Sequence, residues 1–245
     1  MSVPRTDAKM DMRENPKFEF RNSKPRGGFT LIELVVVITV IVILMALLFP
    51  AFKGVQDQAK RTQAKSDITQ VVTAINSYYT EYGKMPVDGT KQGFDTLLGD
   101  PGGSYDNHII FDVLRAISDS DWNSGNVLNP KQIIFFNGAN VKDGTNPRSG
   151  IATQDATVNG VTIKKDAFVD PWGGEYLVSV DADYDGWTQD FIPYSDLTYT
   201  SKTGGSGTHP AVQATATSSS WGKDAKLGTN GDGKYKDSDD VISWQ

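Results

Sequence analysis

The feature that most constrains this chain is an apolar run that begins a few residues after Gly28. Between Leu34 and Phe49 only Thr39 is polar. A helix of about 20 residues, rising ~1.5 Å per residue, spans the ~30 Å hydrocarbon layer of a bilayer. The pattern therefore predicts a transmembrane helix over residues 29–52.

Glu33 lies inside this apolar stretch, where a lone carboxylate is costly because hydrocarbon cannot solvate its charge. A secretory signal would place its cleavage site after the apolar region, whereas here Gly27 and Gly28 precede it. Cleavage after Gly28 would keep the helix on the protein and expose a new cationic amine at Phe29. In a stack of identical helices, that amine could neutralise the Glu33 carboxylate of a neighbouring subunit.

At these residues the chain resembles the type IV pilin and pseudopilin family. The matching positions are Gly28 before the cut, Phe29 and Thr30 as the first mature residues, Glu33 as the fifth, and Pro50. The resemblance implies that a prepilin peptidase cleaves after Gly28 and methylates the new amine. It also implies that Glu33 assists assembly of a helical filament of identical subunits.

The distribution of charge predicts an orientation in the membrane. Residues 1–28 carry a balance of +3, so the formal charge of −6 for the whole chain leaves −9 for residues 29–245. Because positive segments stay on the cytoplasmic side, we expect a single pass with the amino end in the cytoplasm and the acidic remainder across the membrane. The resemblance implies that this membrane is the inner membrane and that the head is periplasmic. An acidic exported head argues against nucleic-acid binding, which needs a basic face.

The helical pattern continues beyond Pro50 with an amphipathic character. Apolar residues recur at steps of three and four, and these are Ala64, Ile68, Val71, Ile75, Tyr78 and Tyr82. The opposite, polar side carries Lys60, Arg61, Lys65, Asp67 and Gln70. Gly83 favours the end of the helix and Pro86 prevents its resumption.

The sequence thus divides into four predicted parts. These are a cleaved leader at 1–28, a transmembrane helix at 29–52, an amphipathic helix at 53–83 and a periplasmic head at 84–245 with an acidic carboxyl-terminal loop. The predicted fold class is α+β, a long amino-terminal helix packed by a small antiparallel sheet. In the head we expect helices over 92–98 and 109–117, a strand over 131–136, a hairpin turn at 158–161, paired strands at 176–180 and 191–194, and a flexible excursion over 201–220.

Catalytic arrangements are hard to find, so we expect no enzyme. The chain has no cysteine, which excludes a thiol nucleophile, a disulfide framework and a thiolate metal site. His108 and His209 lie in turn-like segments without a serine or carboxylate framework around them.

Two acidic loops are candidate metal sites. Asp181, Asp183, Asp185 and Gly186 form the D-x-D-x-D-G opening of a calcium loop, but Ile192 replaces the bidentate glutamate of an EF-hand. This segment is interpreted either as a second calcium loop or as a plain hairpin turn.

The carboxyl end holds the larger acidic cluster. Its five carboxylates repel one another unless a cation or solvent intervenes, and they belong to Asp224, Asp232, Asp237, Asp239 and Asp240. Oxygen-only ligands favour calcium over zinc or copper. A solvated acidic tail is the alternative, although Trp221, Val241 and Trp244 indicate an anchored segment.

A second set of motifs narrows the resemblance to the major pseudopilins of type II secretion systems. The motifs are Asp170-Pro171-Trp172-Gly173 followed by Tyr176, the Trp-Gly-x-Asp segment at 221–224 and the Asp-Asp-Val-x-Ser-Trp segment at 239–244. The resemblance implies a stabilising Ca²⁺ in the carboxyl-terminal loop, with Asp224 as a ligand, followed by Asp232, Asp239 and Asp240. It covers 26–100 and 168–245, and it is interrupted by insertions at about 100–168 and 197–219.

The resemblance implies a structural subunit of a type II secretion pseudopilus that helps to export folded proteins. Its implied partners are further copies of itself, the prepilin peptidase, other pseudopilins, an inner-membrane assembly platform and the membrane. One alternative is a type IV pilus subunit used in adhesion, motility or DNA uptake. Another alternative is a monomeric calcium-binding domain tethered by the helix, in which Glu33 would have no role.

Overall fold

A computed structural model describes residues 27–118, 121–158, 160–189, 191–204 and 207–245. The chain forms two compact units, Met1–Pro50 and Ala51–Gln245. Of the predicted leader, only Gly27 and Gly28 fall within the described residues. Helix α1, Leu31–Tyr82, begins in the first unit and ends in the second.

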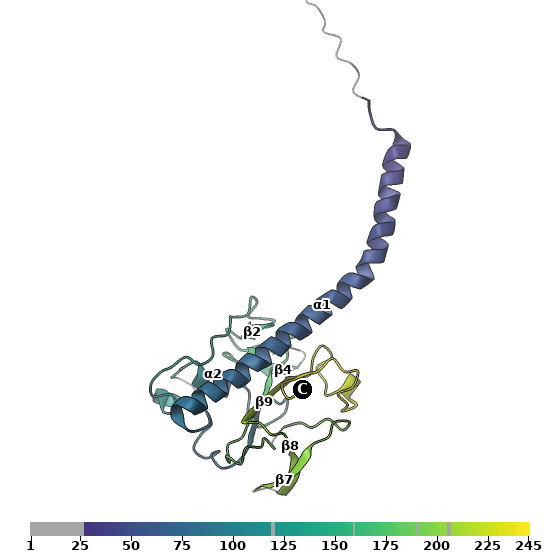
Figure 1. The fold of residues 1–245 in the computed structure, drawn as a ribbon. Helices are drawn as coiled ribbons and strands as arrows, with labels where there is room; N and C mark the ends of the chain where they lie inside the picture. Colours follow the sequence, from purple (N-terminus) through teal and green to yellow (C-terminus); the bar gives the residue numbers. More distant parts are fainter. Residues whose placement is uncertain (1–26, 119–120, 159, 190, 205–206) are drawn as a thin grey trace, which may run out of the picture. The chain divides into compact units, whose positions relative to one another are not determined.

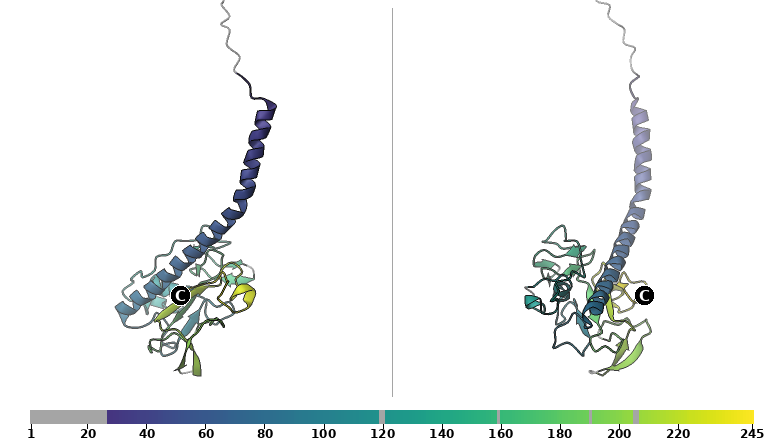
Figure 2. Two further views of the ribbon diagram at one scale, coloured as in Figure 1. Left: turned by 45° about the vertical axis from the view of Figure 1, so that its right-hand side comes forward. Right: turned by 60° about the vertical axis from the view of Figure 1, so that its left-hand side comes forward.

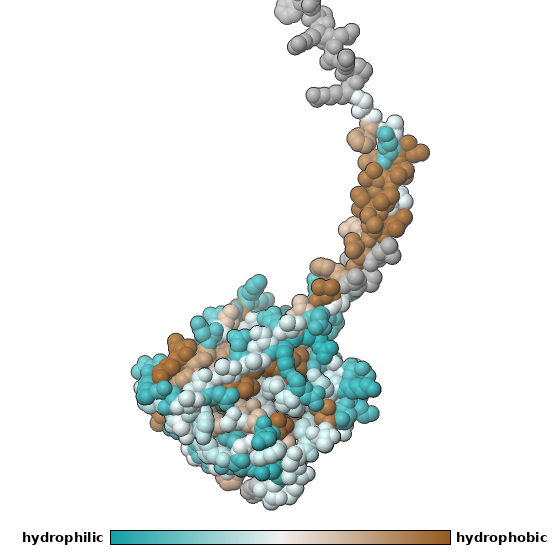
Figure 3. All heavy atoms as spheres, viewed as in Figure 1, coloured by the Kyte–Doolittle hydropathy of each residue, from teal (hydrophilic) through white to brown (hydrophobic). Residues whose placement is uncertain are grey.

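In the first unit, α1 carries exposed apolar side chains along its length. Every large apolar side chain described from Leu31 to Leu48 is exposed, from 44% at Val35 to 81% at Leu31. Figure 3 shows these side chains as a continuous apolar surface on the helix. By length and hydropathy, none of the helices in the described part of the chain qualifies as a membrane-crossing segment. The transmembrane span over 29–52 therefore stays a prediction.

In the second unit, α1 packs through the predicted apolar stripe. The stripe side chains are fully buried at Ala64, Ile68, Val71, Ile75 and Tyr78, and Tyr82 packs against them. The helix ends at Tyr82, as predicted. Gly83 follows with φ +65°, a left-handed conformation that glycine adopts at little cost.

The stripe packs on a four-stranded antiparallel sheet in the order β1-β6-β9-β10. The strands are β1 (Thr96–Leu98), β6 (Leu177–Val180), β9 (Ala216–Ser220) and β10 (Val241–Ile242). Sheet residues such as Val178 and Val180 share one hydrophobic core with the helix stripe. Helix α1 and strand β9 of this arrangement are labelled in Figure 1. This arrangement confirms the predicted α+β class.

The remaining elements surround this core. They are α2 (His108–Leu114), β2 (Gly150–Ile151) paired with β5 (Phe168–Val169), the β3–β4 hairpin (Ala156–Val158 and Val161–Ile163), the β7–β8 hairpin (Thr200–Gly204 and Gly207–Ala211), and 3-10 turns at Ser124–Asn126 and Thr229–Gly231. The right-hand view of Figure 2 shows the teal segments and the yellow carboxyl-terminal segments on opposite sides of α1. The predicted hairpin turn is confirmed by the pairing of Val158 with Val161, and the predicted 109–117 helix corresponds to the shorter α2.

Three predicted helix or strand assignments in the head are wrong. Residues 92–98 form a turn followed by β1, because this segment pairs with β6. Residues 131–136 form no strand, since the N–H groups of Phe135 and Phe136 both donate to the carbonyl of Leu114 instead of to a ladder. Residues 191–194 do not pair with β6, whose neighbours are β1 and β9.

The segment 201–220, predicted to be flexible, supplies the β7–β8 hairpin and strand β9 inside the main sheet. Strand β9 reads Ala-Thr-Ser-Ser-Ser and is buried at every residue. Two of its hydroxyls donate to groups inside the head, Ser218 Oγ to the Leu177 carbonyl at 2.9 Å and Ser220 Oγ to Asp170 Oδ2 at 2.5 Å. Composition alone could not predict this strand, because its burial depends on hydrogen-bond partners elsewhere in the chain.

Candidate functional site

The predicted processing site lies in an exposed and non-helical segment. Residues 27–30 are exposed and precede the first residue of α1, Leu31. The peptide bond between Gly28 and Phe29 is therefore outside the hydrogen-bonded helix. An accessible bond outside a helix suits a peptidase, which must bind its substrate backbone in a cleft.

Glu33 closes a reciprocal cap at the start of α1. Its Oε2 accepts hydrogen bonds from the Thr30 N–H at 2.7 Å and from the Thr30 hydroxyl at 2.8 Å. The Glu33 N–H donates in turn to Thr30 Oγ1 at 3.3 Å. This geometry is a capping box, in which an N-cap threonine and the glutamate three residues later satisfy each other's backbone groups. Within one chain, Thr30 is thus the partner of the carboxylate that sequence reasoning assigned to a neighbour's amine.

The carboxyl-terminal acidic cluster brings together three of the four predicted ligands. Asp224, Asp239 and Asp240 each offer a carboxylate oxygen, and the three oxygens lie within 4.8 Å of one another. Asp224 follows strand β9, whereas Asp239 and Asp240 precede β10. Because β9 and β10 are antiparallel, the ladder brings these two ends of the segment together.

Asp240 is the buried member of this cluster. The residue is 1% exposed, and Oδ2 accepts the Gly228 N–H at 2.7 Å. The buried Oδ1 makes no hydrogen bond of good geometry with the described residues, although the Tyr194 hydroxyl lies near the carboxylate. Burial raises the pKa of Asp240 to about 6, and the carboxylates of Asp239 and Asp224 add to the rise. A buried oxygen without a well-formed hydrogen bond, beside two further carboxylates, fits an oxygen-ligated cation such as Ca²⁺.

Asp232 does not join the cluster. Its Oδ1 accepts the N–H groups of Thr229 at 3.0 Å and Lys234 at 2.9 Å, so it stabilises a turn. The structure therefore does not bring Asp232 together with the other three predicted ligands, and its role as a ligand stays a prediction. The segment around it is anchored as predicted, since Val241 joins the core and the Trp244 ring lies 5.5 Å from that of Phe191.

Helix α1 holds the acidic segment through residues of its polar side. Arg61 Nη2 donates to the Ser238 carbonyl at 2.9 Å, and Lys65 Nζ donates to the Ile242 carbonyl at 2.7 Å. The partly buried Asp67 accepts the Tyr176 hydroxyl at 2.8 Å. The polar side of the helix is therefore a docking surface for the carboxyl end, a role that helical spacing alone does not reveal.

The second predicted loop is rearranged in the structure. Asp181 and Asp183 cluster with Asp95, and Asp185 is not part of the group. Asp185 is exposed, accepts the Trp187 N–H at 2.7 Å and lies 4.0 Å from Lys202 Nζ. Sequence reasoning missed Asp95 because it is far from the D-x-D-x-D-G motif along the chain and carries no motif of its own.

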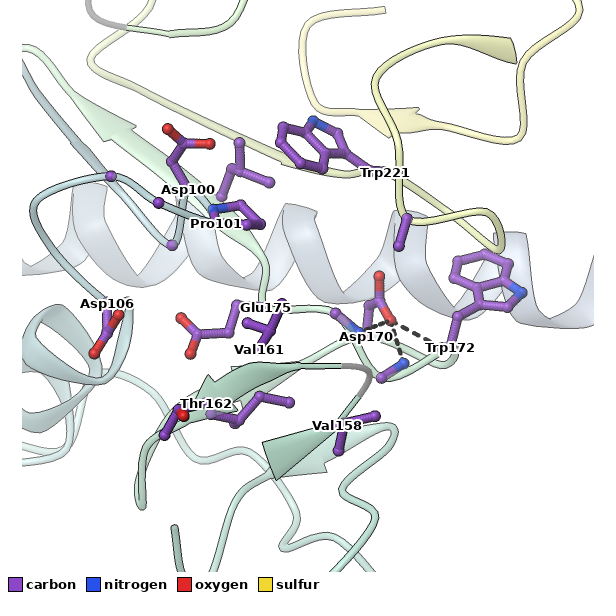
Figure 4. Close-up of a pocket in the computed structure, with 18 of the residues that line it drawn as sticks. Asp100, Pro101, Asp106, Val158, Val161, Thr162, Asp170, Trp172, Glu175 and Trp221 are labelled. Carbon is purple, nitrogen blue, oxygen red and sulfur yellow. Dashed lines mark hydrogen bonds between the residues drawn. The ribbon is translucent and has the colours of Figure 1, made fainter. Parts of the chain in front are cut away.

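The Asp-Pro-Trp-Gly segment forms a turn around one buried carboxylate (Figure 4). Asp170 Oδ1 accepts the N–H groups of Trp172 at 2.8 Å, Gly173 at 2.7 Å and Gly174 at 2.9 Å. Asp170 Oδ2 accepts the Ser220 hydroxyl at 2.5 Å. This second contact connects the turn to the end of β9, so the motif is structural and positions the start of the acidic segment.

A cavity of about 600 Å³ lies beside this turn and is lined by Glu175, Asp106, Trp172 and Trp221 (Figure 4). Glu175 Oε2 accepts the Asn107 N–H at 2.9 Å, and Oε1 is buried without a hydrogen-bond partner among the described residues. Burial raises the pKa of Glu175 to about 7, helped by the charge of Asp106. The pocket is therefore acidic, with a carboxyl group that gains a proton near neutral pH.

A long amino-terminal helix with an exposed apolar half, a processing motif before it and a small α+β head together define a pilin-like protein. Comparison with known proteins agrees. Residues 23–49 match the family described as "Prokaryotic N-terminal methylation motif". No solved structure matches the chain.

Relatives with assigned names fall into two related groups. The chain is 30% identical over 132 residues to the type II secretion system core protein G of Aeromonas hydrophila, covering 51% of this chain and 91% of that protein. It is 38% identical over 81 residues to the protein of the same name from Pseudomonas aeruginosa, covering 33% of this chain and 56% of that relative. It is also 35% identical over 78 residues to the type IV major pilin protein PilE1 of Neisseria gonorrhoeae, covering 32% of this chain and 47% of the pilin. The chain belongs to the type II secretion system core protein G family of pseudopilins.

Proposed function

We propose that the chain is a structural subunit of a type II secretion pseudopilus, a filament that helps to export folded proteins. The observation that carries the proposal is the pairing of an exposed apolar helix, Leu31–Leu48, with an accessible processing site directly before it. Apolar side chains on this scale need cover from lipid or protein. Lipid of the inner membrane covers them before assembly, and the helices of sister subunits cover them in the filament.

Glu33 has two successive partners in this proposal. Before processing, Thr30 satisfies its carboxylate through the capping box. After cleavage at Gly28, the new positively charged Phe29 amine of a neighbouring subunit neutralises the Glu33 carboxylate. Prepilin peptidase, other pseudopilins and the assembly platform of the inner membrane are the partners that this route requires.

The head contributes a cation site that stabilises the subunit. Asp224, Asp239 and Asp240 would hold Ca²⁺, and the support is the orphaned Oδ1 of Asp240 among three converging carboxylates. The ion would balance the charge between the segments that flank β9 and β10. Because Arg61 of α1 donates to the Ser238 carbonyl, an ordered carboxyl-terminal loop also stabilises the packing of α1 on the head.

Two substitutions at the capping box test the assembly role. We expect Glu33→Ala to be processed but to abolish filaments, seen by electron microscopy of detergent extracts after overexpression, and to abolish secretion. Thr30→Ala removes the same cap but keeps the carboxylate, so we expect filaments to persist. If both variants assemble alike, Glu33 is a helix cap only. Mass spectrometry should find Phe29 at the amino terminus in a host with the peptidase, and an intact Met1 there would contradict the processing step.

A type IV pilus subunit is the second candidate, favoured by the 35% identity to the gonococcal pilin over 78 residues. Such a subunit would form filaments that extend beyond the cell surface and serve adhesion, motility or DNA uptake. Labelled antibodies against the head discriminate the two. Labelling of intact cells without overexpression favours a pilus, and labelling only after the outer membrane is opened favours a pseudopilus.

A further inference from the structure

Two aspartates face each other at the end of the β1–β6 ladder. Asp95 directly precedes β1, and Asp181 directly follows β6. The register pairs Thr96 with Val180, so the next pair along the ladder places Asp95 opposite Asp181. Like charges directly opposite each other on neighbouring strands are destabilising. The ladder therefore ends in a repulsive pair that needs compensation.

A third carboxylate joins this pair instead of a cation. Asp183 lies two residues beyond Asp181, and one oxygen from each of the three aspartates lies within 4.8 Å of the others. Among the described residues, no lysine or arginine forms an ion pair with any of the three. Burial raises the pKa of Asp95 to about 7 and that of Asp181 to about 6, and the charge of Asp183 adds to both.

The buried member of this cluster has a free acceptor. Asp181 is 2% exposed, and its buried Oδ1 makes no hydrogen bond of good geometry in the described part of the chain, although the Tyr184 N–H lies near the carboxylate. Its Oδ2 accepts the Gly186 N–H at 2.9 Å, which orients the carboxylate. Buried polar atoms in native proteins are nearly always satisfied, by protein, water or an ion. An unsatisfied oxygen beside two more carboxylates has the chemistry of a cation ligand.

Backbone groups hold the ligand from the other strand in place. Asp95 Oδ1 accepts the Ala182 N–H at 3.2 Å, and Asp95 Oδ2 accepts the Gln189 N–H at 2.5 Å. The Gly93 N–H donates to the Ala182 carbonyl at 2.6 Å. These contacts connect the approach to β1 with the loop after β6, so the three carboxylates belong to one preorganised structure.

We propose that Asp95, Asp181 and Asp183 bind a second divalent cation of the calcium type, separate from the carboxyl-terminal cluster. Carboxylate oxygens select hard cations such as Ca²⁺, and water would complete the coordination. The ion binds the start of β1 to the end of β6 and removes the repulsion between them. Asp185 is not a ligand of this site, although it completes the D-x-D-x-D-G motif.

The two cation sites lie at opposite ends of the main sheet. Val180, at the end of β6, pairs with Ala216 at the start of β9, whereas the carboxyl-terminal cluster adjoins Ser220 at the end of β9. Because no ligand is shared, the sites load independently. A variant that loses one cation site should therefore keep the other. Filament assembly can be tested separately from both sites.

Equilibrium dialysis of ⁴⁵Ca²⁺ against the full-length protein in detergent micelles, at pH 7.5, tests the proposal. We expect two equivalents in the wild type, and one equivalent less in Asp95→Asn and in Asp183→Asn. Asp185→Asn is the matched control and should keep both equivalents. Asp239→Asn should lose only the carboxyl-terminal equivalent, and combining it with Asp95→Asn should abolish binding.

The outcomes separate this site from its alternatives. A bound equivalent that Asp95→Asn removes supports the site even when Asp239→Asn has no effect. Unchanged binding in Asp95→Asn and Asp183→Asn overturns it, as does a wild type that binds no calcium. Loss of the equivalent in Asp185→Asn would overturn it too, since a linear motif loop would then be the ligand set. Near-UV circular dichroism of each variant checks that the head remains folded.

Discussion

Asp170→Ala tests the most demanding structural claim, that one carboxylate organises the Asp-Pro-Trp-Gly turn and connects it to β9. The side chain is 1% exposed and accepts four hydrogen bonds. Alanine leaves three backbone N–H groups and the Ser220 hydroxyl without this acceptor. At about 1 kcal/mol per lost bond, and more where the donor stays buried, the head should lose about 4 kcal/mol of unfolding free energy.

The assay is urea unfolding of the full-length protein in detergent, followed by the tryptophan emission of the head. With a slope of about 2 kcal/mol per molar urea, the loss should lower the midpoint by about 2 M. Asp170→Asn keeps an oxygen for the three N–H groups and should lose only about 1 kcal/mol, because just the Ser220 contact is altered.

Asp143→Ala is the matched control for this series. Asp143 Oδ1 also accepts a backbone N–H, that of Thr145 at 2.9 Å, but its side chain is exposed to water. Water replaces the lost bond there, so we expect an unchanged midpoint. Equal midpoints for Asp170→Ala and Asp143→Ala would refute the reasoning, since burial would then not determine the cost.

Three further predictions use the same protein. Burial raises the Glu175 pKa from 4.5 to about 7, so the folded head binds the Glu175 proton more tightly than the unfolded chain does. The protonated side chain therefore contributes stability that is fully present below pH 4.5 and is lost as the pH rises through 7. This pKa difference of ~2.5 units means that the free energy of unfolding should fall by about 3 kcal/mol between pH 4.5 and 8. Glu175→Gln should remove that part of the pH dependence, as measured by urea unfolding. Gly99→Ala should cost about 3 kcal/mol, because φ is +83° and the new Cβ would lie 2.4 Å from the Tyr176 carbonyl oxygen, whereas Gly93→Ala, with φ +93° and open space, should cost about 1 kcal/mol of backbone strain. Wild-type protein with calcium removed by a chelator should melt about 5–10 °C below calcium-saturated protein. Identical melting curves under the two conditions would contradict both cation sites.

Periodicity and local chemistry were enough to predict the helix and its end. The steps from Ala64 to Tyr78 place one apolar face on a helix whatever the rest of the chain does, and that face is buried. Gly83 ends the helix because its own backbone adopts the left-handed conformation. The hairpin at Val158 was likewise a short-range signal, as its pairing with Val161 depends on a tight turn.

Strand β9 and the short edge strands could not be predicted in the same way. A run of serines can be buried only where hydrogen-bond acceptors such as the Leu177 carbonyl and the Asp170 carboxylate lie within reach of the hydroxyls. Likewise β1 is a strand because β6 lies beside it, not because of its own composition. Pairing of this kind depends on residues far apart in the chain, which a local pattern does not contain.

The sequence by itself determined the processing motif, the apolar helix and the acidic character of two loops, because each depends on neighbours within a few residues. Only the tertiary structure decided which carboxylates meet. It leaves Asp232 and Asp185 outside the two carboxylate clusters and places Asp95 inside one, since antiparallel register, not spacing along the chain, places Asp95 against Asp181. Charges converge where strands end side by side, and the fold alone sets those ends.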